Sequence, residues 1–199
     1  PLANSAGNGL EVREAMCLLR GEIKGGRLYD VTKALAIQNG CLSGLFSSER
    51  EGDEFVTRVL SNGAAAEHFA QSIAAMGGPI DLLTNAMRIS SAPIIRPVMP
   101  AEEDWGKALV EVDTRQLGLA VVDLGGGRTH SGQSIDHSVG CTNWMRRGSL
   151  ADSQVPLAFI HARNQVDFDR AARRIQQAFL FSEKLQTSQD AIVIEHRTA

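Results

Sequence analysis

The sequence predicts a chain of mixed α/β and α+β class in two parts, a mostly helical first half followed by a compact α+β unit. Up to about residue 90, apolar residues recur at helical spacing and glycines punctuate the turns. The stretch PIIRPVMP (93–100) is then β-branched and bounded by prolines, which is typical of an edge strand or an extended linker. Strand-like alternation follows it. We therefore expect a boundary near residues 92–104.

The first half is predicted to contain five helices, over residues 8–20, 28–39, 49–60, 64–75 and 79–87. Asn8 is the expected N-cap of the first helix, with Glu11 as its capping-box partner, and Gly21 is the expected stop. The fifth helix begins with Pro79, where a missing N–H group costs least.

The second half alternates strands and helices. Strands are predicted in GKALVEVD (106–113), PLAFIHA (156–162) and AIVIEHR (191–197). Asp113 or Thr114 caps a helix that ends at Leu124, before the glycines 125–127, which we expect to need positive φ. A long amphipathic helix is predicted over 166–184, with Phe179 on its inner face.

Charge and cysteine usage exclude several classes of function. A net charge of −3 and an isoelectric point near 6.0 argue against nucleic acid or an anionic membrane as a partner. No apolar run approaches the ~20 residues that span a bilayer, and the chain has no secretory leader pattern. Cys17, Cys41 and Cys141 lack the spacing of a zinc site or a disulfide framework. We expect reduced thiols in a cytoplasmic protein.

Two glycine-rich stretches are candidate anion sites, each with a structural alternative. SAGNG (5–9) opens a helix and could bind phosphate at the free N–H groups, or serve only as a cap. LGGGRTHSG (124–132) could form an anion-binding nest beside Arg128, or cap the preceding helix and turn. The histidines do not form a complete catalytic or metal site. His130 and His137 lie near Asp136 in a polar loop, where they could bind a metal or relay protons, or could simply be exposed loop residues. Neither GxSxG nor HExxH occurs.

Three stretches together resemble the thymidine phosphorylases and related pyrimidine-nucleoside phosphorylases. They are PLANSAGNGLEVREA (1–15), DTRQLGLAVVDLGGGR (113–128) and SIDHSVGCTN (134–143), with weaker support from RLYDVTKALA (27–36) and PLAFIHA. Their order and approximate spacing match the family, and the resemblance covers essentially the whole chain. It implies that residues 1–100 are the C-terminal part of the family's large α/β domain. Residues 101–199 would be its C-terminal domain of α/β-hammerhead type.

The resemblance implies a transferase, a pentosyltransferase, that splits thymidine or a related nucleoside with phosphate to give the base and 2-deoxyribose 1-phosphate. In the family the phosphate-binding and base-binding residues precede the position that matches Pro1. No catalytic residue can therefore be assigned to this sequence, and we expect this chain alone to be inactive. No cofactor is expected. The resemblance also implies a homodimer for the full-length protein, formed mainly through an N-terminal helical domain.

One binding site is implied by the resemblance. Some family members bind a cation, potassium, through the segment that matches residues 1–14. The corresponding ligands here are the backbone carbonyls of Leu2 and Ser5 and the side chain of Glu14. Further ligands lie upstream in the family. The alternative for Glu14 is a solvated helical carboxylate paired with Arg13 or Lys24.

Three other interpretations stay open. The chain could belong to a nucleoside-monophosphate phosphorylase of the same family. It could be a non-catalytic binding or assembly module, since hammerhead folds resemble biotinyl-type carriers, although the Met-Lys-Met tripeptide of those carriers is absent. It could also be an anion binder that depends on Arg128.

Overall fold

The computed structural model describes residues 1–85, 89–183 and 192, and these fall into two compact units. Among the described residues, the sheet unit contains Ala3–Val12 and residues 89–183, and the helical unit contains residues 13–85 and Ile192. Pro1 groups with the first and Leu2 with the second. The helix α1 (Asn8–Leu19) begins in the sheet unit and ends in the helical unit.

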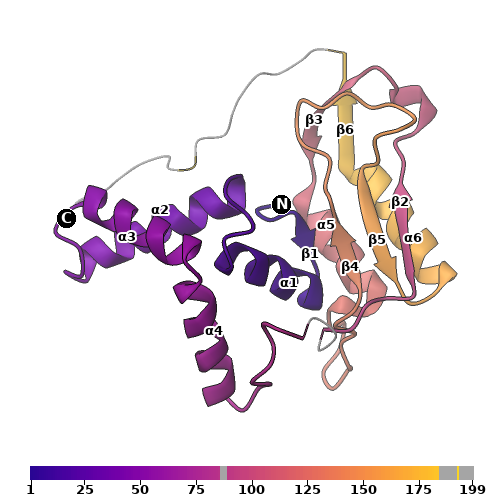
Figure 1. The fold of residues 1–199 in the computed structure, drawn as a ribbon. Coiled ribbons are helices and arrows are strands. Elements are labelled where there is room, and N and C mark those ends of the chain that lie inside the picture. The colour runs from indigo at the N-terminus through magenta and orange to yellow at the C-terminus, as the bar shows by residue number, and fades with distance from the viewer. Residues whose placement is uncertain (86–88, 184–191, 193–199) are drawn as a thin grey trace. The chain divides into compact units, whose positions relative to one another are not determined.

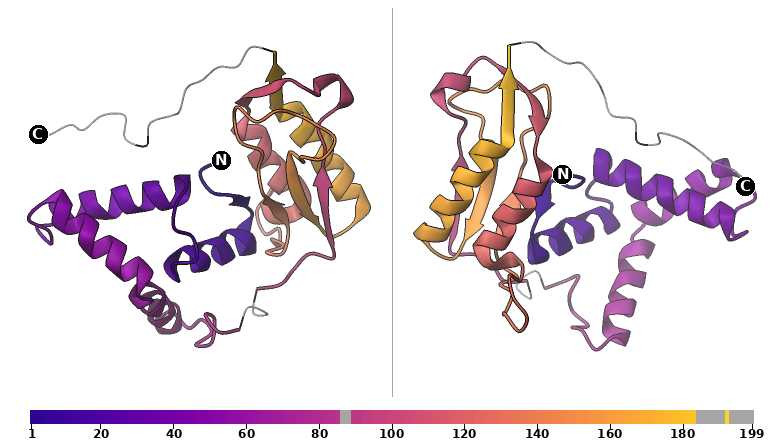
Figure 2. Two further views of the ribbon diagram at one scale, coloured as in Figure 1. Left: turned by 45° about the horizontal axis from the view of Figure 1, so that its top comes forward. Right: turned by 180° about the vertical axis from the view of Figure 1, so that it is seen from behind.

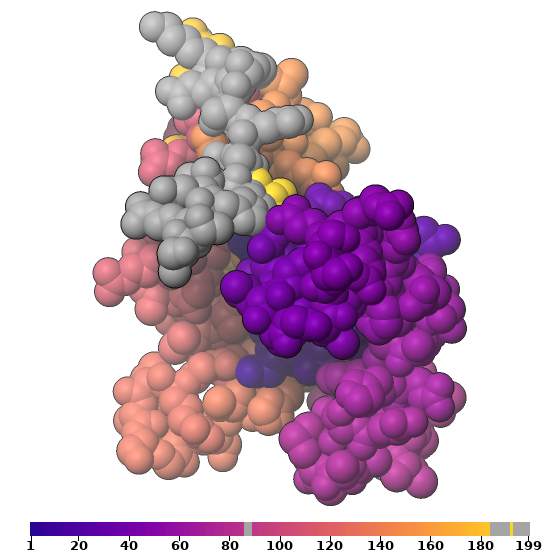
Figure 3. Space-filling model, turned by 90° about the vertical axis from the view of Figure 1, so that its left-hand side faces the viewer, coloured from indigo at the N-terminus to yellow at the C-terminus, as the bar shows by residue number. Residues whose placement is uncertain are grey.

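The helical unit is built from the end of α1 and from α2 (Arg27–Leu42), α3 (Glu49–Ser61) and α4 (Ala64–Ala75). Figure 3 shows α2, α3 and α4 at its surface. The Ser48 hydroxyl accepts a hydrogen bond from the Glu51 N–H and caps α3. The core is small, with Phe46, Val56 and Leu60 at its centre.

Phe46 is the centre of this small core because two glycines make room for it. Gly40 of α2 and Gly52 of α3 face its ring, and a β-carbon at Gly40 would overlap the ring edge. The two helices can therefore approach each other closely around one aromatic side chain. Lys33 and Asp53 add an ion pair of 2.7 Å between α2 and α3.

The sheet unit contains a four-stranded antiparallel sheet in the order β1-β4-β5-β2 (Figure 1). Its strands are β1 (Ser5–Ala6), β4 (Gly140–Thr142), β5 (Ala158–Ala162) and β2 (Ile94–Val98). A second, two-stranded sheet pairs β3 (Ala108–Val112) with β6 (Phe179–Ser182). The short 3-10 helix Glu102–Asp104 precedes β3. The first strand of the larger sheet thus comes from residues more than 130 positions away from its neighbour in sequence.

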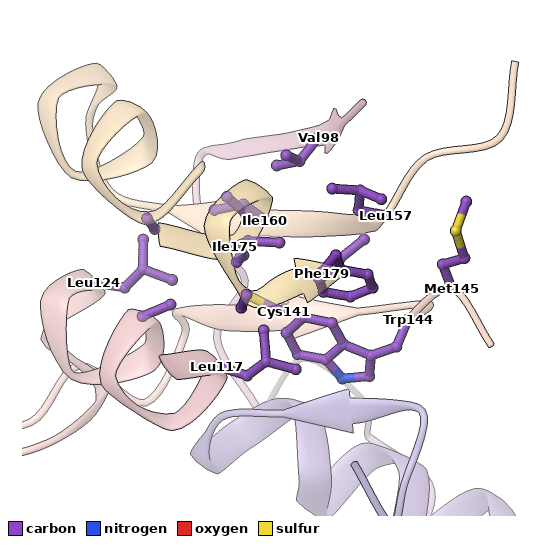
Figure 4. Close-up of a cluster of buried hydrophobic side chains, with 14 of the residues drawn as sticks. Val98, Leu117, Leu124, Cys141, Trp144, Met145, Leu157, Ile160, Ile175 and Phe179 are labelled. Carbon is purple, nitrogen blue, oxygen red and sulfur yellow. The ribbon is translucent and has the colours of Figure 1, made fainter. Parts of the chain in front are cut away.

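Two helices cover one face of the larger sheet (Figure 2). They are α5 (Thr114–Val121), extended by the π-helical turn Val122–Gly126, and α6 (Gln165–Ala178). Asp113 and Asn164 cap them by accepting backbone N–H groups with their side chains. Their inner faces enclose the largest core of the molecule. Figure 4 shows its side chains, among them Leu117, Leu124, Cys141, Trp144, Leu157, Ile160, Ile175 and Phe179.

The mixed α/β content and most predicted elements are confirmed, and several predictions are wrong. Residues 79–85 form turns instead of a helix, and 86–88 lie outside the described residues. The last helix ends at Ala178, and Phe179 begins β6, because Phe179–Ser182 pairs with β3. The strand predicted at 191–197 lies outside the described residues, apart from Ile192. The α/β-hammerhead type and the 1–100 and 101–199 domains stay predictions. Within the described part of the chain, no helix is long and apolar enough to cross a membrane.

Replacement of Ile160 by alanine should destabilise the sheet unit by about 2–5 kcal/mol, because Ile160 is fully buried on the central strand β5. Both tryptophans, Trp105 and Trp144, lie in this unit, so tryptophan fluorescence during urea unfolding reports on it alone. The control is Ile95→Ala on the neighbouring strand β2, where the side chain is half exposed and little should change. Equal losses for the two variants would contradict the described core.

Candidate functional site

The three stretches that carry the resemblance meet in the sheet unit. Asn4, just before β1, contacts Asn143, just after β4, and the Asn143 N–H donates to the Asn4 carbonyl at 2.8 Å. The Asn8 side chain donates to the Gly126 carbonyl at 2.8 Å. The Gly9 N–H donates to the His137 carbonyl at 2.9 Å. Residues 4–9, 124–128 and 136–143 therefore form one contiguous structural block, which we call the motif block.

Three glycines allow the segments of the motif block to touch through their backbones. A β-carbon at Gly7 would lie 2.5 Å from the Val139 carbonyl oxygen, and one at Gly9 would lie 2.5 Å from that of His137. On the opposing strand, a β-carbon at Gly140 would overlap the Ala6 carbonyl oxygen, and Gly140 also has a φ of 148°. No other residue type fits these positions without a backbone shift. We call this contact between residues 7–9 and 137–140 the glycine seam.

The start of α1 differs from the predicted capping box. The helix begins at Asn8, and the Glu11 carboxylate accepts the N–H of Gly7, the residue before the helix, at 2.8 Å. The Asn8 side chain points away to the Gly126 carbonyl because the glycine seam brings that loop within reach. The N–H groups of Gly7 and Gly9 are thus bonded to protein acceptors, which favours a structural role for SAGNG over phosphate binding.

The loop after the triple glycine is closed by its own hydrogen bonds. Arg128 donates from Nε to the Gln133 carbonyl at 3.0 Å, and Thr129 donates from its N–H and hydroxyl groups to the Gln133 side chain. Of the three glycines, only Gly125 has positive φ, 92°, so the prediction for Gly126 and Gly127 is wrong. A β-carbon at Gly126 would instead lie 2.8 Å from the Val121 side chain. Close packing explains this glycine, and Asp136 beside Gly125 disfavours an anion there.

Asp136 holds the motif block together through its carboxylate. One oxygen accepts the Ser138 N–H at 2.9 Å and the Ser138 hydroxyl at 2.7 Å, and the other accepts Nε of Arg163 at 2.9 Å. Burial alone would raise the pKa of Asp136, but the Ser138 hydrogen bonds and the Arg163 charge outweigh it and lower the pKa below its usual value. Asp136 therefore stays ionised and orients the backbone that leads into the glycine seam.

The histidines and cysteines form no metal site in the described residues. His130 and His137 have exposed side chains, and no group of three or more His, Cys, Asp or Glu residues in the described part of the chain could hold a metal. All three cysteines are free thiols. Burial raises the pKa of Cys141 to about 12, so its thiol stays protonated and is a poor nucleophile.

Sequence reasoning missed two residues of the motif block. His161 is buried on β5, with Nε2 3.0 Å from the Thr142 hydroxyl. Asn143 has a φ of 57°, and no other described non-glycine residue has positive φ. Asparagine tolerates this conformation better than most residues, but only pairing with β1 shows where it is needed.

The predicted cation ligands are spread along the N-terminal segment. Leu2 is exposed before β1, Ser5 is buried on β1, and Glu14 is half-buried on α1. Asn4 and Asn143 form a hydrogen-bonded pair of the antiparallel ladder, so the next pair, Ser5 and Thr142, is a non-hydrogen-bonded one. The Ser5 carbonyl consequently points away from β4. The potassium site itself stays a prediction.

Comparison with known families identifies the class of the C-terminal half. Residues 108–182 match the family described as the pyrimidine nucleoside phosphorylase C-terminal domain. The matched segment begins with β3 and ends with β6. It contains α5, α6 and two of the three segments of the motif block, 124–128 and 136–143. The match supports the predicted resemblance to the C-terminal portion of the pyrimidine nucleoside phosphorylases over residues 108–182.

Replacement of Gly140 by alanine should destabilise the sheet unit by about 2 kcal/mol or more, because its β-carbon overlaps the Ala6 carbonyl and its φ is positive. The matched control is Gly118→Ala on α5, where the space around the β-carbon is open. That change should stabilise the unit by about 0.5–1 kcal/mol, since alanine favours a helix. Urea unfolding followed by tryptophan fluorescence measures both. A neutral Gly140 variant would contradict the glycine seam.

Replacement of Asp136 by asparagine should cost about 1–3 kcal/mol near neutral pH, where its ionised carboxylate accepts hydrogen bonds from Ser138. A carboxyl group with a lowered folded-state pKa stabilises the protein above its unfolded pKa of about 4 and loses that effect as the pH falls through the folded value. The difference between wild type and variant should therefore shrink on acidification, as measured by unfolding at several pH values.

Arg163→Gln is the control for this experiment. The Arg163 side chain is 68% exposed, so loss of its ion pair should cost less than about 1 kcal/mol. A pH-independent loss in the Asp136 variant would show that its charge is not what stabilises the loop.

Proposed function

We propose that this chain is the C-terminal part of a thymidine phosphorylase. The enzyme would convert thymidine and phosphate reversibly into thymine and 2-deoxyribose 1-phosphate. The observation that carries the proposal is the family match of residues 108–182. The motif block also supports it, because three stretches chosen from sequence alone meet through backbone and side-chain hydrogen bonds.

The structure of the motif block supports a scaffolding role for this part of the enzyme. Its glycines approach protein carbonyls, Arg128 bonds to Gln133, and Asp136 bonds to Ser138 and Arg163. These groups satisfy one another. Phosphorolysis needs cationic and hydroxyl donors around phosphate and around the departing base, where negative charge develops. We propose that those donors lie outside residues 1–199, and that the motif block holds the C-terminal domain in register with them.

The experiment is phosphate-dependent release of thymine, measured on two preparations checked by intact mass. One is this chain alone. The other is the polypeptide extended by the coding sequence that precedes it. We expect release only from the extended polypeptide and only with phosphate, with sulfate as the control anion. Release by this chain alone would overturn the placement of the catalytic groups. No release from the extended polypeptide with any pyrimidine nucleoside would overturn the proposed function.

Substrate choice is measured in the same assay. Thymidine, uridine and their 5′-monophosphates distinguish a thymidine phosphorylase from a broader pyrimidine-nucleoside phosphorylase and from a nucleoside-monophosphate phosphorylase. We propose a preference for thymidine. The homodimer and the cytoplasmic location implied by the resemblance are part of the same proposal.

We further propose that the carbonyls of Leu2 and Ser5 and the carboxylate of Glu14 bind potassium. The donor set fits a hard cation, because all three ligand atoms are oxygens. The direction of the Ser5 carbonyl, away from β4, also fits a ligand role. When bound, the ion would supply a positive charge that ties together backbone carbonyls of this segment.

A further inference from the structure

Asparagine followed by glycine occurs three times in the chain, at Asn8, Asn39 and Asn62. Asparagine deamidates most readily before glycine, because glycine has no side chain to keep its backbone nitrogen away from the asparagine side chain. In this reaction that nitrogen attacks the side-chain carbonyl carbon of the preceding asparagine. The surroundings of the glycine N–H therefore decide which of the three asparagines reacts in the folded protein.

In the first two pairs the glycine nitrogen is held in place. The Gly9 N–H donates to the His137 carbonyl at 2.9 Å, and a β-carbon at Gly9 would lie 2.5 Å from that same oxygen. Gly40 is buried inside α2, where backbone N–H groups are bonded within the helix, and the Phe46 ring packs against it. Neither nitrogen can reach its asparagine side chain unless a hydrogen bond breaks and packed neighbours move.

The third pair lies in the connection between α3 and α4 (Figure 1) and differs in each of these respects. Asn62 is exposed, and Gly63 has a φ of 85°. Apart from its own chain neighbours, no atom lies within 4 Å of the position that a β-carbon on Gly63 would take. Within the described part of the chain, the Gly63 N–H has no hydrogen-bond acceptor. This nitrogen is therefore accessible, and the space around it is open.

The Asn62 side chain is also held beside this nitrogen. Its Oδ1 accepts the Ala64 N–H at 3.0 Å, which closes a ring that includes the Gly63 nitrogen. Ala64 is the first residue of α4, so Oδ1 lies at the positive end of a helix dipole. A donor at this position stabilises the negative charge that develops on Oδ1 as the nitrogen attacks. Asn62 therefore combines an accessible nucleophile with an activated carbonyl group.

We propose that Asn62 is a deamidation site of the folded protein and that the fold protects the other two Asn–Gly pairs. The Gly63 nitrogen forms a bond to Cγ of Asn62 and gives up its proton. The bond from Cγ to Nδ2 breaks, Nδ2 takes up a proton and leaves as ammonia, and a cyclic succinimide remains. Water then opens the ring at Cγ, which gives aspartate, or at the main-chain carbonyl, which gives isoaspartate. Either product adds a negative charge at the start of α4, and isoaspartate also lengthens the backbone by a methylene group.

The test is incubation of this 199-residue chain at mildly alkaline pH, followed by tryptic peptide mapping with mass spectrometry. The three pairs fall in different tryptic peptides, residues 1–13, 34–50 and 59–88, and fragmentation assigns the site within each. The mass change from amide to acid should appear at least about tenfold faster at Asn62 than at Asn8 or Asn39, because the latter two need a local opening of the fold.

The matched control is the same chain unfolded in guanidinium chloride, where the three glycine nitrogens are equally accessible. There the three rates should agree within about twofold. A second control is Asn62→Gln, whose longer side chain disfavours ring closure. This variant should show no mass change at position 62 and should leave the slow rates at Asn8 and Asn39 as they are.

Two outcomes would overturn the inference. The first is a rate at Asn62 in the folded chain that is no faster than the rates at Asn8 and Asn39. The second is the same preference for Asn62 in the folded and the unfolded chain, because the local sequence and not the fold would then select the site. Neither outcome bears on phosphorolysis, which thymine release tests separately.

Discussion

The sheet unit depends on one steric constraint, the direct backbone contact of the glycine seam. Gly7, Gly9 and Gly140 face carbonyl oxygens at distances that leave no room for a side chain. This contact adds β1 to the sheet and places the start of α1 against the loop 136–140. The other contacts of the motif block join the same segments of the chain. Asn8 reaches Gly126, Asn4 reaches Asn143, and Thr142 lies opposite Ser5.

Hydrogen bonds to ionised carboxylates stabilise the part of the motif block that has little apolar packing. Residues 128–134 are mostly exposed and none of them belongs to the described core, so hydrogen bonds to an ionised group hold the end of this loop. Asp136 supplies that group, and its lowered pKa follows from the donors of Ser138 and Arg163. The helix start uses the same device on a smaller scale, with the Glu11 carboxylate accepting the Gly7 N–H. Both carboxylates satisfy backbone donors that the glycine seam would otherwise leave without partners.

These interactions are structural, and they fit the proposed place of this chain in a phosphorolytic enzyme. In the proposed enzyme, a part that donates no hydrogen bonds to phosphate must still keep a stable fold of its own. The segment 1–15 is suited to this task, because β1 belongs to the sheet unit while α1 continues into the helical unit. The proposed potassium ligands lie on this shared segment.

Local patterns in the sequence determined most of the helices, because capping residues and apolar spacing act within a few residues. Asp113 and Asn164 cap α5 and α6, Ser48 caps α3, and the alternation of 108–112 and 158–162 predicts strands. The resemblance to the family was also recognisable from the residue patterns of three stretches. The short strands β1 and β4 were not, since two or three residues carry no periodicity. The helical pattern also continued past Ala178, where pairing with β3 overrides it and starts β6.

The sequence alone therefore determined the class of the chain, the order of its main elements and the segments worth attention. Only the tertiary structure decided what those segments do to one another. Asn8 binds Gly126 instead of capping its own helix, Gly126 is a packing glycine, and Asn143 adopts positive φ to hold Asn4. The Asn8–Gly126 and Asn4–Asn143 contacts join residues more than 100 positions apart, and Gly126 is limited by the Val121 and Val139 side chains packed against it. No pattern of neighbouring residues records the long-range contacts, and they form only when the strands pair.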